Sequence, residues 1–212
     1  MHQTALREVL VATSNPHKLD EIRAVFGGLG VRVLGLDALG RKFAEPEEDG
    51  NTFADNARIK AVAYAAMTGR TCLADDSGLE VDALGGEPGV RSARWSGVGA
   101  TRAERDAANN ELLLRRLRGV PDERRSARFV CAMCLAEPNG AVIAETHGEF
   151  PGVIGEAPRG TNGFGYDPLL WLPDEGRSSA ELTSDEKNAR SHRGHATRAM
   201  AAKLRALGLL PS

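Results

Sequence analysis

The segment Glu8–Gly27 limits the possible folds most, because a strand, a tight turn and a helix follow one another there without a linker. The run "EVLVAT" (8–13) is apolar and typical of a buried strand. Asn15 suits a helix N-cap and Pro16 the first helical position, after which apolar residues recur at helical spacing as far as Gly27. A strand that leads directly into a helix favours an α/β fold.

The rest of the chain continues this alternation. In the first half we expect a strand at 31–36, an acidic loop at 44–51, a helix from about Thr52 to Gly69 and a short buried strand at 71–74. A helix at 103–118 and a hairpin at 127–150 with the turn Glu-Pro-Asn-Gly are expected next. The final helix is expected from about Ser191, because Ala196, Met200, Leu204 and Leu207 recur there at helical spacing. Strands and helices alternate in the first half, and an antiparallel hairpin lies in the second. This order predicts a mixed sheet with flanking helices.

Composition excludes several classes of protein. The chain of 212 residues is 42% hydrophobic and 26% charged, which is typical of a globular protein with a buried core. A net charge of -2 and a pI near 6.2 argue against nucleic acid as a partner. No apolar run approaches the ~20 residues of a membrane span, and the N-terminus does not resemble a signal peptide. We therefore expect a cytoplasmic protein without a membrane partner.

The three cysteines are predicted to be structural. Cys131 and Cys134 have C-x-x-C spacing, but they lie in a predicted strand, where an offset of three places two side chains on opposite faces. Together with Cys72 they make an odd number. We interpret all three as small buried apolar residues and not as metal ligands or a redox pair.

The segment "TSNPHK" (13–18) is a candidate anion site. The first turn of a helix offers free N–H groups and the positive end of the helix dipole, which favour a phosphate. Lys18 places a cation where the dipole disfavours one, unless an anion binds nearby. An ordinary N-cap with a solvated lysine explains this segment equally well.

Asn56 and Lys60 share one helix face and, taken alone, indicate a surface pair.

Asp75 and Asp76 directly follow the predicted strand 71–74. Adjacent carboxylates repel one another unless a cation or hydrogen-bond donors satisfy them, and the carboxyl ends of strands are where open α/β sheets bind ligands. We favour a metal or general-base role over a simple turn. Magnesium takes one or two carboxylates plus phosphate oxygens, and Glu47 or Glu48 of the acidic loop could supply another. Ser77 lacks the G-x-S-x-G context of a nucleophile.

Two later segments are glycine-rich or basic. "RGTNGFGYDPLL" (159–170) has the order G-x-x-G-x-G and does not open a helix, so it is not a dinucleotide fingerprint. Lys187, His192, Arg193 and His195 surround a predicted helix start, where basic residues oppose the helix dipole unless an acceptor is near. The two histidines could bind zinc, but without H-E-x-x-H that signal is weak.

Five of these segments together resemble the inosine/xanthosine triphosphate pyrophosphatase family. They are "TSNPHK", "EEDGNTFADNARIKA", "DDSGLEVDALGGEPGVRSAR", "GFGYDP" and "EKNARSHR". They occur in the family's order, and the resemblance extends from residue 9 to beyond 196, so it covers nearly the whole chain. It implies hydrolysis of deaminated purine nucleoside triphosphates (ITP, dITP and XTP) to the monophosphate and pyrophosphate. It also implies Mg²⁺, a homodimer, and an elongated mixed sheet in one domain (1–212) with two lobes around a central substrate cleft.

The resemblance also implies site residues. The triphosphate would bind Thr13, Ser14, Asn15, Lys18 and Lys60. Glu48 and Asp76 would bind the metal, with Asp76 also the general base and Ser77 beside it touching substrate. The nucleobase pocket would contain Phe164, Gly165, Tyr166, Asp167, Lys187, His192 and Arg193.

Different residues are expected to bind the base by stacking and to select it by hydrogen bonding. Phe164 offers a stacking face to any base. We expect Arg193 or His192 to donate to O6 of the purine and Asp167 to accept from N1–H, so that adenine is rejected through unpaired polar groups. Two alternatives remain open, a nucleotide-sensing module without turnover and a pyrophosphatase for modified pyrimidine triphosphates.

Overall fold

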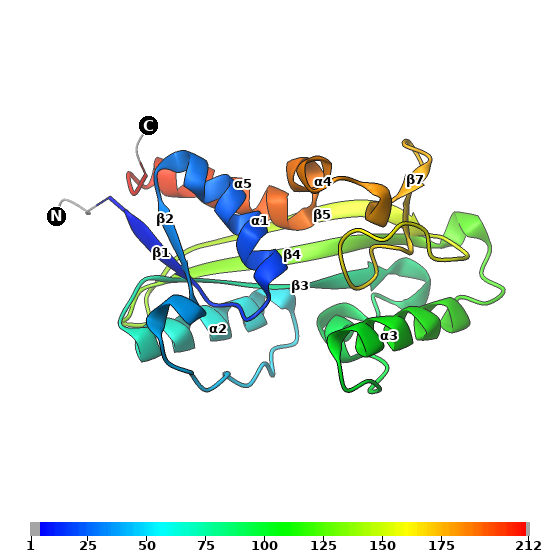
Figure 1. Ribbon diagram of the computed structural model, residues 1–212, viewed down its shortest axis with the longest axis horizontal. Helices are drawn as coiled ribbons and strands as arrows, with labels where there is room; N and C mark the ends of the chain where they lie inside the picture. The colour runs from blue at the N-terminus through cyan, green and yellow to red at the C-terminus, as the bar shows by residue number, and fades with distance from the viewer. Residues whose placement is uncertain (1–4, 211–212) are drawn as a thin grey trace. The chain divides into compact units, whose positions relative to one another are not determined.

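The computed structural model describes residues 5–210, which form a seven-stranded sheet with helices against it (Figure 1). The strands are β1 (Glu8–Val11), β2 (Arg32–Gly35), β3 (Cys72–Val81), β4 (Ser126–Ala136), β5 (Val142–Ile154), β6 (Leu170–Leu172) and β7 (Arg177–Ser178). The α-helices are α1 (Pro16–Phe26), α2 (Phe53–Thr68), α3 (Arg102–Arg116), α4 (Ser184–Arg190) and α5 (His192–Ala206). The strand order is β2-β1-β3-β4-β5-β6-β7. β1 pairs parallel with β2 and β3, whereas β6 pairs antiparallel with β5 and β7, which confirms the mixed α/β sheet.

The chain divides into two compact units. The first contains the residues up to Asp76, 131–148 and those from His192 onward, and the second contains 77–130 and 149–191. Strands β3, β4 and β5 each contribute residues to both units. Each unit has a hydrophobic core of its own.

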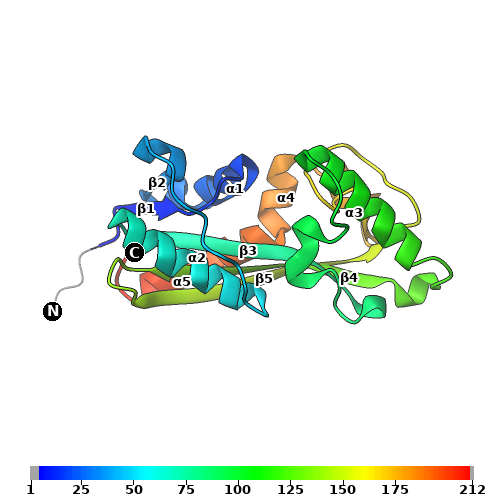
Figure 2. The same ribbon diagram turned by 90° about the horizontal axis from the view of Figure 1, so that it is seen from below.

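The first unit has its main core under α1 and α5. Its buried cluster includes Val9 of β1, Ile22 and Phe26 of α1, and Met200 and Leu204 of α5. The buried residues of α2 do not belong to this cluster, and α2 is drawn apart from α1 in Figure 2. The core under α1 and α5 is therefore separate from the side chains that α2 buries.

Local signals explain where the helices of this unit begin. Asn15 caps α1 by accepting a hydrogen bond from the N–H of His17 at 3.1 Å, as the sequence predicts. Thr52 and Asp55 form a capping box at the start of α2. The apolar spacing predicted for the last helix is confirmed at Met200 and Leu204, but α5 ends at Ala206 and Leu207 is 44% exposed.

The core of the second unit lies beside α3. Leu113 and Leu117 of the α3 region pack with Phe129, Phe150 and Tyr166 in one buried cluster. Capping boxes begin both α-helices of this unit, from Thr101 to Glu104 for α3 and from Thr183 to Glu186 for α4. The helix α3 thus lies close to the predicted interval 103–118, and α4 is an element that the sequence analysis did not separate from α5.

One strand boundary was wrong, and the error bears on the site. The sequence predicted a strand that ends at residue 74, whereas β3 runs from Cys72 to Val81. Asp75 and Asp76 thus lie inside the strand and not after its end. Strands are depleted in aspartate because an unpaired buried carboxylate is costly, but cations and donors from the helices pair with both side chains.

The hairpin and the cysteines are confirmed. The N–H of Gly140 donates to the carbonyl of Glu137 at 2.9 Å, which closes the predicted Glu-Pro-Asn-Gly turn between β4 and β5. Cys72, Cys131 and Cys134 are free and buried. Burial raises the pKa of Cys72 and of Cys134 to about 12, so these thiols stay protonated and inert at neutral pH.

Candidate active site

Asp75 is the most enclosed carboxylate of the first unit. It is 2% exposed, and its Oδ2 lies 2.9 Å from Nζ of Lys18 and 3.2 Å from Nε of Arg193. Burial alone would raise its pKa, but the two cations hold the pKa of Asp75 well below its usual range. Its other oxygen, Oδ1, is buried and has no hydrogen-bond partner among residues 5–210. Asp75 is therefore ionised and retains one unused acceptor.

Asp76 has a different set of partners, all from α2. Its Oδ2 accepts a hydrogen bond from Nδ2 of Asn56 at 3.1 Å, and its Oδ1 lies 3.3 Å from Nζ of Lys60. Adjacent strand residues point to opposite faces, so Asp75 meets α1 and α5 while Asp76 meets α2. Burial raises the pKa of Asp76 above its ordinary value, although Lys60 and Lys18 oppose this shift. A carboxylate with a raised pKa is the property expected of a general base.

The residues around Asp76 are positioned by α2 and the acidic loop. Asn56 and Lys60 lie one turn apart on α2, and Asn56 is 1% exposed, so the surface-pair interpretation was wrong. The N–H of Gly50 donates to Oδ1 of Asn56 at 2.9 Å, which ties the loop to the helix. Glu48 of that loop lies 2.9 Å from Nζ of Lys60, whereas Glu47 is exposed. The i,i+4 spacing of Asn56 and Lys60 was the available sequence signal.

The lysine of α2 is strongly held as a cation. Burial alone would lower the pKa of Lys60, but the carboxylates of Asp76, Asp75 and Glu48 outweigh that effect and raise the pKa. Lys18 lies in the first turn of α1, and its ion pair with Asp75 explains why a cation is tolerated at this helix end.

The cluster can accommodate a divalent cation. Glu21, Glu48, Asp75 and Asp76 face Lys18, Lys60 and Arg193, so four carboxylates meet three cations and one negative charge is left over. Glu48 and Asp76 already converge on one ammonium group. Within residues 5–210 no three His, Cys, Asp or Glu side chains are grouped as a metal site. This donor set fits Mg²⁺, which binds one or two carboxylates and completes its coordination with phosphate oxygens and water.

The other residues of the predicted triphosphate site are near the start of α1. Oγ1 of Thr13 accepts a hydrogen bond from the N–H of Asn15 at 3.1 Å, and Ser14 is exposed in the same turn. The turn thus presents Ser14 and Lys18 at a helix N-terminus, the arrangement that favours phosphate.

The segment Phe164–Asp167, predicted for the base, lies in the second unit. Asp167 is 2% exposed and forms an ion pair with Lys187. Its carboxylate also accepts hydrogen bonds from the N–H of Phe164 and from Oγ of Ser179, both at 2.8 Å. These contacts engage both oxygens of Asp167, so they support a role in holding the loop and Lys187 more than the predicted contact with N1–H.

The aromatic residues of this loop have separate surroundings. Tyr166 is 3% exposed, belongs to the core, and donates from its hydroxyl to the carbonyl of Ser92 at 3.0 Å. Its predicted contact with the base stays a prediction. Phe164 is partly exposed, with Arg102 of α3 at 4.5 Å from its ring centre and Lys187 at 5.4 Å. The ring therefore lies in a cationic setting.

Two residues of α3 hold the loop, and the sequence analysis missed them. The N–H of Gly165 donates to Oδ2 of Asp106, and Nδ2 of Asn110 donates to the carbonyl of Gly165, both at 3.0 Å. The i,i+4 spacing of Asp106 and Asn110 places them on one helix face, which was the only sequence signal. Gly165 thus contributes its backbone to the loop's attachment.

Glycine is required at Gly163 for a steric reason. Its φ is +77°, and a Cβ there would lie 2.2 Å from Oδ2 of Asp167 and 2.8 Å from Nζ of Lys187. Any side chain at this position would displace the ion pair.

The remaining predicted residues lie in different surroundings. Arg193 is 1% exposed and lies 2.6 Å from Glu21 as well as near Asp75, so it forms ion pairs within the carboxylate cluster of the first unit. His192 is buried at the start of α5, and His195 is exposed. Ser77 lies within β3 and is partly exposed.

Comparison with known proteins decides the family. The profile of the Ham1 family matches residues 9–203. The chain belongs to the Ham1 family. It is 53% identical to a dITP/XTP pyrophosphatase of Frankia alni, with 93% of this chain and 96% of that protein aligned, and 48% identical to one of Anaeromyxobacter sp., with 90% and 94% aligned. The solved structure of a HAM1 protein from Coxiella burnetii has a TM-score of 0.83 at 39% identity, covering 95% of this chain and 100% of that one. The family resemblance inferred from the five motifs is confirmed.

Proposed function

We propose that this protein hydrolyses deaminated purine nucleoside triphosphates, ITP, dITP and XTP, to the nucleoside monophosphate and pyrophosphate, which removes them from the nucleotide pool. The observation that carries the proposal is Asp76, a buried carboxylate with a raised pKa, held by Asn56 and Lys60 beside Glu48. The names of the Ham1-family relatives support the same reaction. The proposal makes the whole chain, 1–212, one catalytic domain.

The chemistry requires water activation and charge neutralisation. Asp76 accepts a proton from the attacking water, and the hydrogen bond from Asn56 fixes the orientation of its carboxylate. Lys18 and Lys60 neutralise the phosphate charges, and the exposed turn at Ser14 offers donors at the start of α1. In the resting protein these lysines are paired with carboxylates, so substrate phosphates exchange one anionic partner for another.

Glu48 and Asp76 would hold Mg²⁺. Bound there, the ion would supply Lewis-acid stabilisation of the charge that develops on the phosphates. The leftover negative charge of the cluster, and the convergence of Glu48 and Asp76 on one ammonium group, support this assignment.

The loop of the second unit is proposed to recognise the base. Phe164 stacks on the purine, and Lys187, oriented by Asp167, donates to the 6-oxo oxygen. An ammonium group has donors only, so it leaves the 6-amino group of adenine without an acceptor. Rejection of this kind reaches roughly 10⁴-fold. His192 and Arg193 stay proposed as substrate-binding residues.

Further properties are proposed on the resemblance. We propose a homodimer in the cytoplasm, without nucleic acid or membrane as a partner. Of the helices in the described part of the chain, none is both long and apolar enough to cross a membrane.

A substrate panel tests the proposal. Pyrophosphate release from ITP, XTP, dITP, ATP and a modified pyrimidine triphosphate is measured with Mg²⁺ present and absent. We expect turnover of the three deaminated purines only, and only with the metal. Binding without turnover would favour a nucleotide sensor, and preference for the pyrimidine would favour the other alternative. Both alternatives are less favoured, since a sensor needs no carboxylate cluster and the relatives carry the name of a purine enzyme.

The acidic loop provides a matched pair of variants. Glu48→Gln removes the carboxylate that faces Lys60, whereas Glu47→Gln changes the exposed neighbour. Glu48→Gln is expected to raise the magnesium concentration needed for half-maximal rate by about tenfold or more, and Glu47→Gln to leave it unchanged. Equal behaviour of the two variants would remove Glu48 from the proposed metal site.

A further inference from the structure

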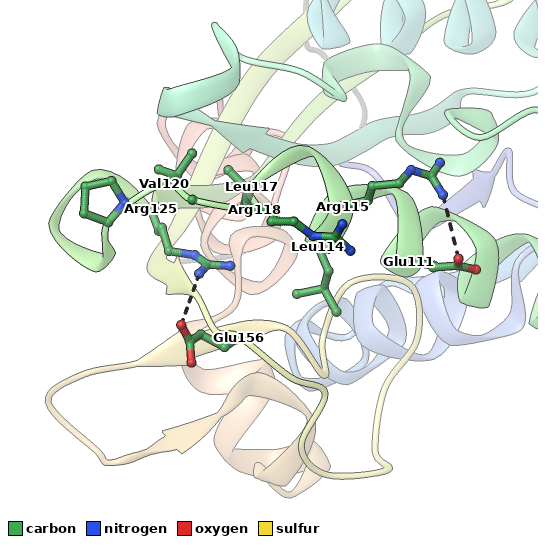
Figure 3. Close-up of a pocket in the computed structure, with 10 residues that line it drawn as sticks. Glu111, Leu114, Arg115, Leu117, Arg118, Val120, Arg125 and Glu156 are labelled. Carbon is green, nitrogen blue, oxygen red and sulfur yellow. Dashed lines mark ion pairs between the residues drawn. The ribbon is translucent and has the colours of Figure 1, made fainter.

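The second unit contains a pocket that shares no residue with the candidate active site. It has a volume of about 650 Å³ and lies where α3 ends (Figure 3). Its lining combines cations and apolar side chains: Glu111, Leu114, Arg115, Leu117, Arg118, Gly119, Val120, Pro121, Arg125 and Glu156. A volume of this size is in the range of pockets that bind small organic molecules.

Arg125 is the unusual residue of this pocket. It is 6% exposed, and its guanidinium donates from Nη2 to the carbonyl of Gly155 at a long 3.4 Å. Its Nε is buried and has no hydrogen-bond partner in the described part of the chain. Nη1 lies 3.9 Å from carboxylate oxygens of Asp122 and Glu156, too far for hydrogen bonds, and both of those side chains are more than four-fifths exposed. The guanidinium of Arg125 thus has one buried donor without a partner, Nε, and only long contacts at its two Nη atoms.

Another fully buried arginine of the chain provides a comparison. Arg193 has carboxylate oxygens at 2.6 Å from Nη1 and 3.2 Å from Nε. Burying a charge is costly unless it is paired and hydrogen-bonded, and Arg193 meets that condition within the protein. Arg125 does not meet it within residues 5–210, so its missing partner is expected to come from outside the chain.

The rest of the lining indicates the chemistry of that partner. Arg115 and Arg118 add two exposed cations, and Arg115 is paired only loosely with Glu111, at 3.7 Å. Figure 3 shows Arg125 directed toward Glu156 and Arg115 toward Glu111. Leu114 of α3 is partly exposed and lines the pocket. The lining thus combines three arginines with apolar side chains.

We propose that this pocket binds a small organic anion, whose carboxylate or phosphate group pairs with the Nε and Nη donors of Arg125. The planar guanidinium fork matches both oxyanions bidentately. Arg118 and Arg115 supply outer positive charge, and Leu114 and Val120 contact the apolar part of the ligand. This inference is independent of the proposed function.

The test follows the Arg125 Nε–H resonance by NMR while the intact protein is titrated with inorganic phosphate, phenyl phosphate or benzoate. We expect a saturable shift with an aromatic anion at low millimolar concentration, and several-fold weaker binding of inorganic phosphate because it lacks the apolar part. Saturation by phenyl phosphate alone assigns the pocket to phosphate esters, and saturation by benzoate alone assigns it to carboxylates. Failure of all three probes to shift the resonance would overturn the proposal. Equal affinity of the pocket for inorganic phosphate and for the aromatic anions would overturn it too.

Matched variants separate a built site from general charge attraction. Arg118→Gln removes a lining cation and is expected to weaken binding roughly fivefold, whereas Arg124→Gln removes an exposed cation outside the lining and is expected to leave it unchanged. Arg125→Lys keeps the charge, removes the fork, and is expected to abolish saturable binding, followed on the backbone amide of Gly119. Equal weakening in Arg118→Gln and Arg124→Gln would contradict the proposal.

Discussion

Replacing Gly163 with alanine tests how the 163–167 loop is held together. The new Cβ would lie 2.2 Å from Oδ2 of Asp167, an oxygen that also contacts Lys187 and the N–H of Phe164. The φ of +77° is itself unfavourable for alanine by about 1 kcal/mol. Displacing a buried, hydrogen-bonded carboxylate adds about 1–3 kcal/mol, so we expect a total loss of roughly 2–4 kcal/mol.

Gly176→Ala is the matched control. Gly176 lies in the same unit with φ of +65°, and apart from the glycine and its two chain neighbours no atom of the described residues lies within 4 Å of the position that its Cβ would take. It should therefore lose only the backbone contribution, about 1 kcal/mol. The measurement is the free energy of unfolding from urea titrations, together with kcat/KM for ITP. We expect Gly163→Ala to be the less stable variant and to show a raised KM, because Lys187 is displaced. Equal stability and equal KM in the two variants would refute this description of the loop.

Three further predictions concern other contacts. Asn56→Ala removes a hydrogen bond that lowers the pKa of Asp76, so the acidic limb of the pH–rate profile should move to higher pH and kcat should fall by about tenfold or more; an unchanged profile would contradict the contact. Glu186 has its pKa lowered from 4.5 to about 2, so its stabilising contribution is complete above pH 4.5 and is lost as the pH falls through 2. The difference in urea midpoint between the protein and Glu186→Gln should therefore shrink over that interval, and a constant difference would argue against the shift. Asn110→Ala removes the bond to the carbonyl of Gly165 and should raise KM for ITP several-fold with little change in kcat, whereas a fall in kcat alone would argue against a positioning role.

The sequence predicted the parts of the fold that local rules determine. The Asn15 cap, the helix spacing on α1 and the Glu-Pro-Asn-Gly turn are all confirmed, because each depends on residues within a few positions. The end of β3 was missed for the opposite reason. Asp75 is tolerated inside a strand because it forms ion pairs with Lys18 and Arg193. These residues are 57 and 118 positions away in the chain, so local propensity gives no signal of them.

The candidate site shows the same contrast between features that the sequence predicts and contacts that depend on distant residues. Lys60, Glu48 and Asp76 were predicted from the family resemblance, and the structure brings them into contact. The place of Tyr166 in the core was not predicted, because an aromatic residue beside a glycine-rich loop has the same sequence pattern whether it faces a ligand or the core. The attachment of the loop to Asn110 depends on a contact across 55 positions, for which only helix spacing gave a signal.

The most direct test of the proposed reaction is hydrolysis of ITP in water enriched in heavy oxygen, followed by mass spectrometry of both products. Attack on the α-phosphorus predicts that the heavy oxygen enters the nucleoside monophosphate and that the pyrophosphate is unlabelled. The same experiment with Asp76→Asn should yield neither product at a comparable rate. Label in pyrophosphate would contradict attack on the α-phosphorus, and formation of the diphosphate with inorganic phosphate would contradict the proposed function.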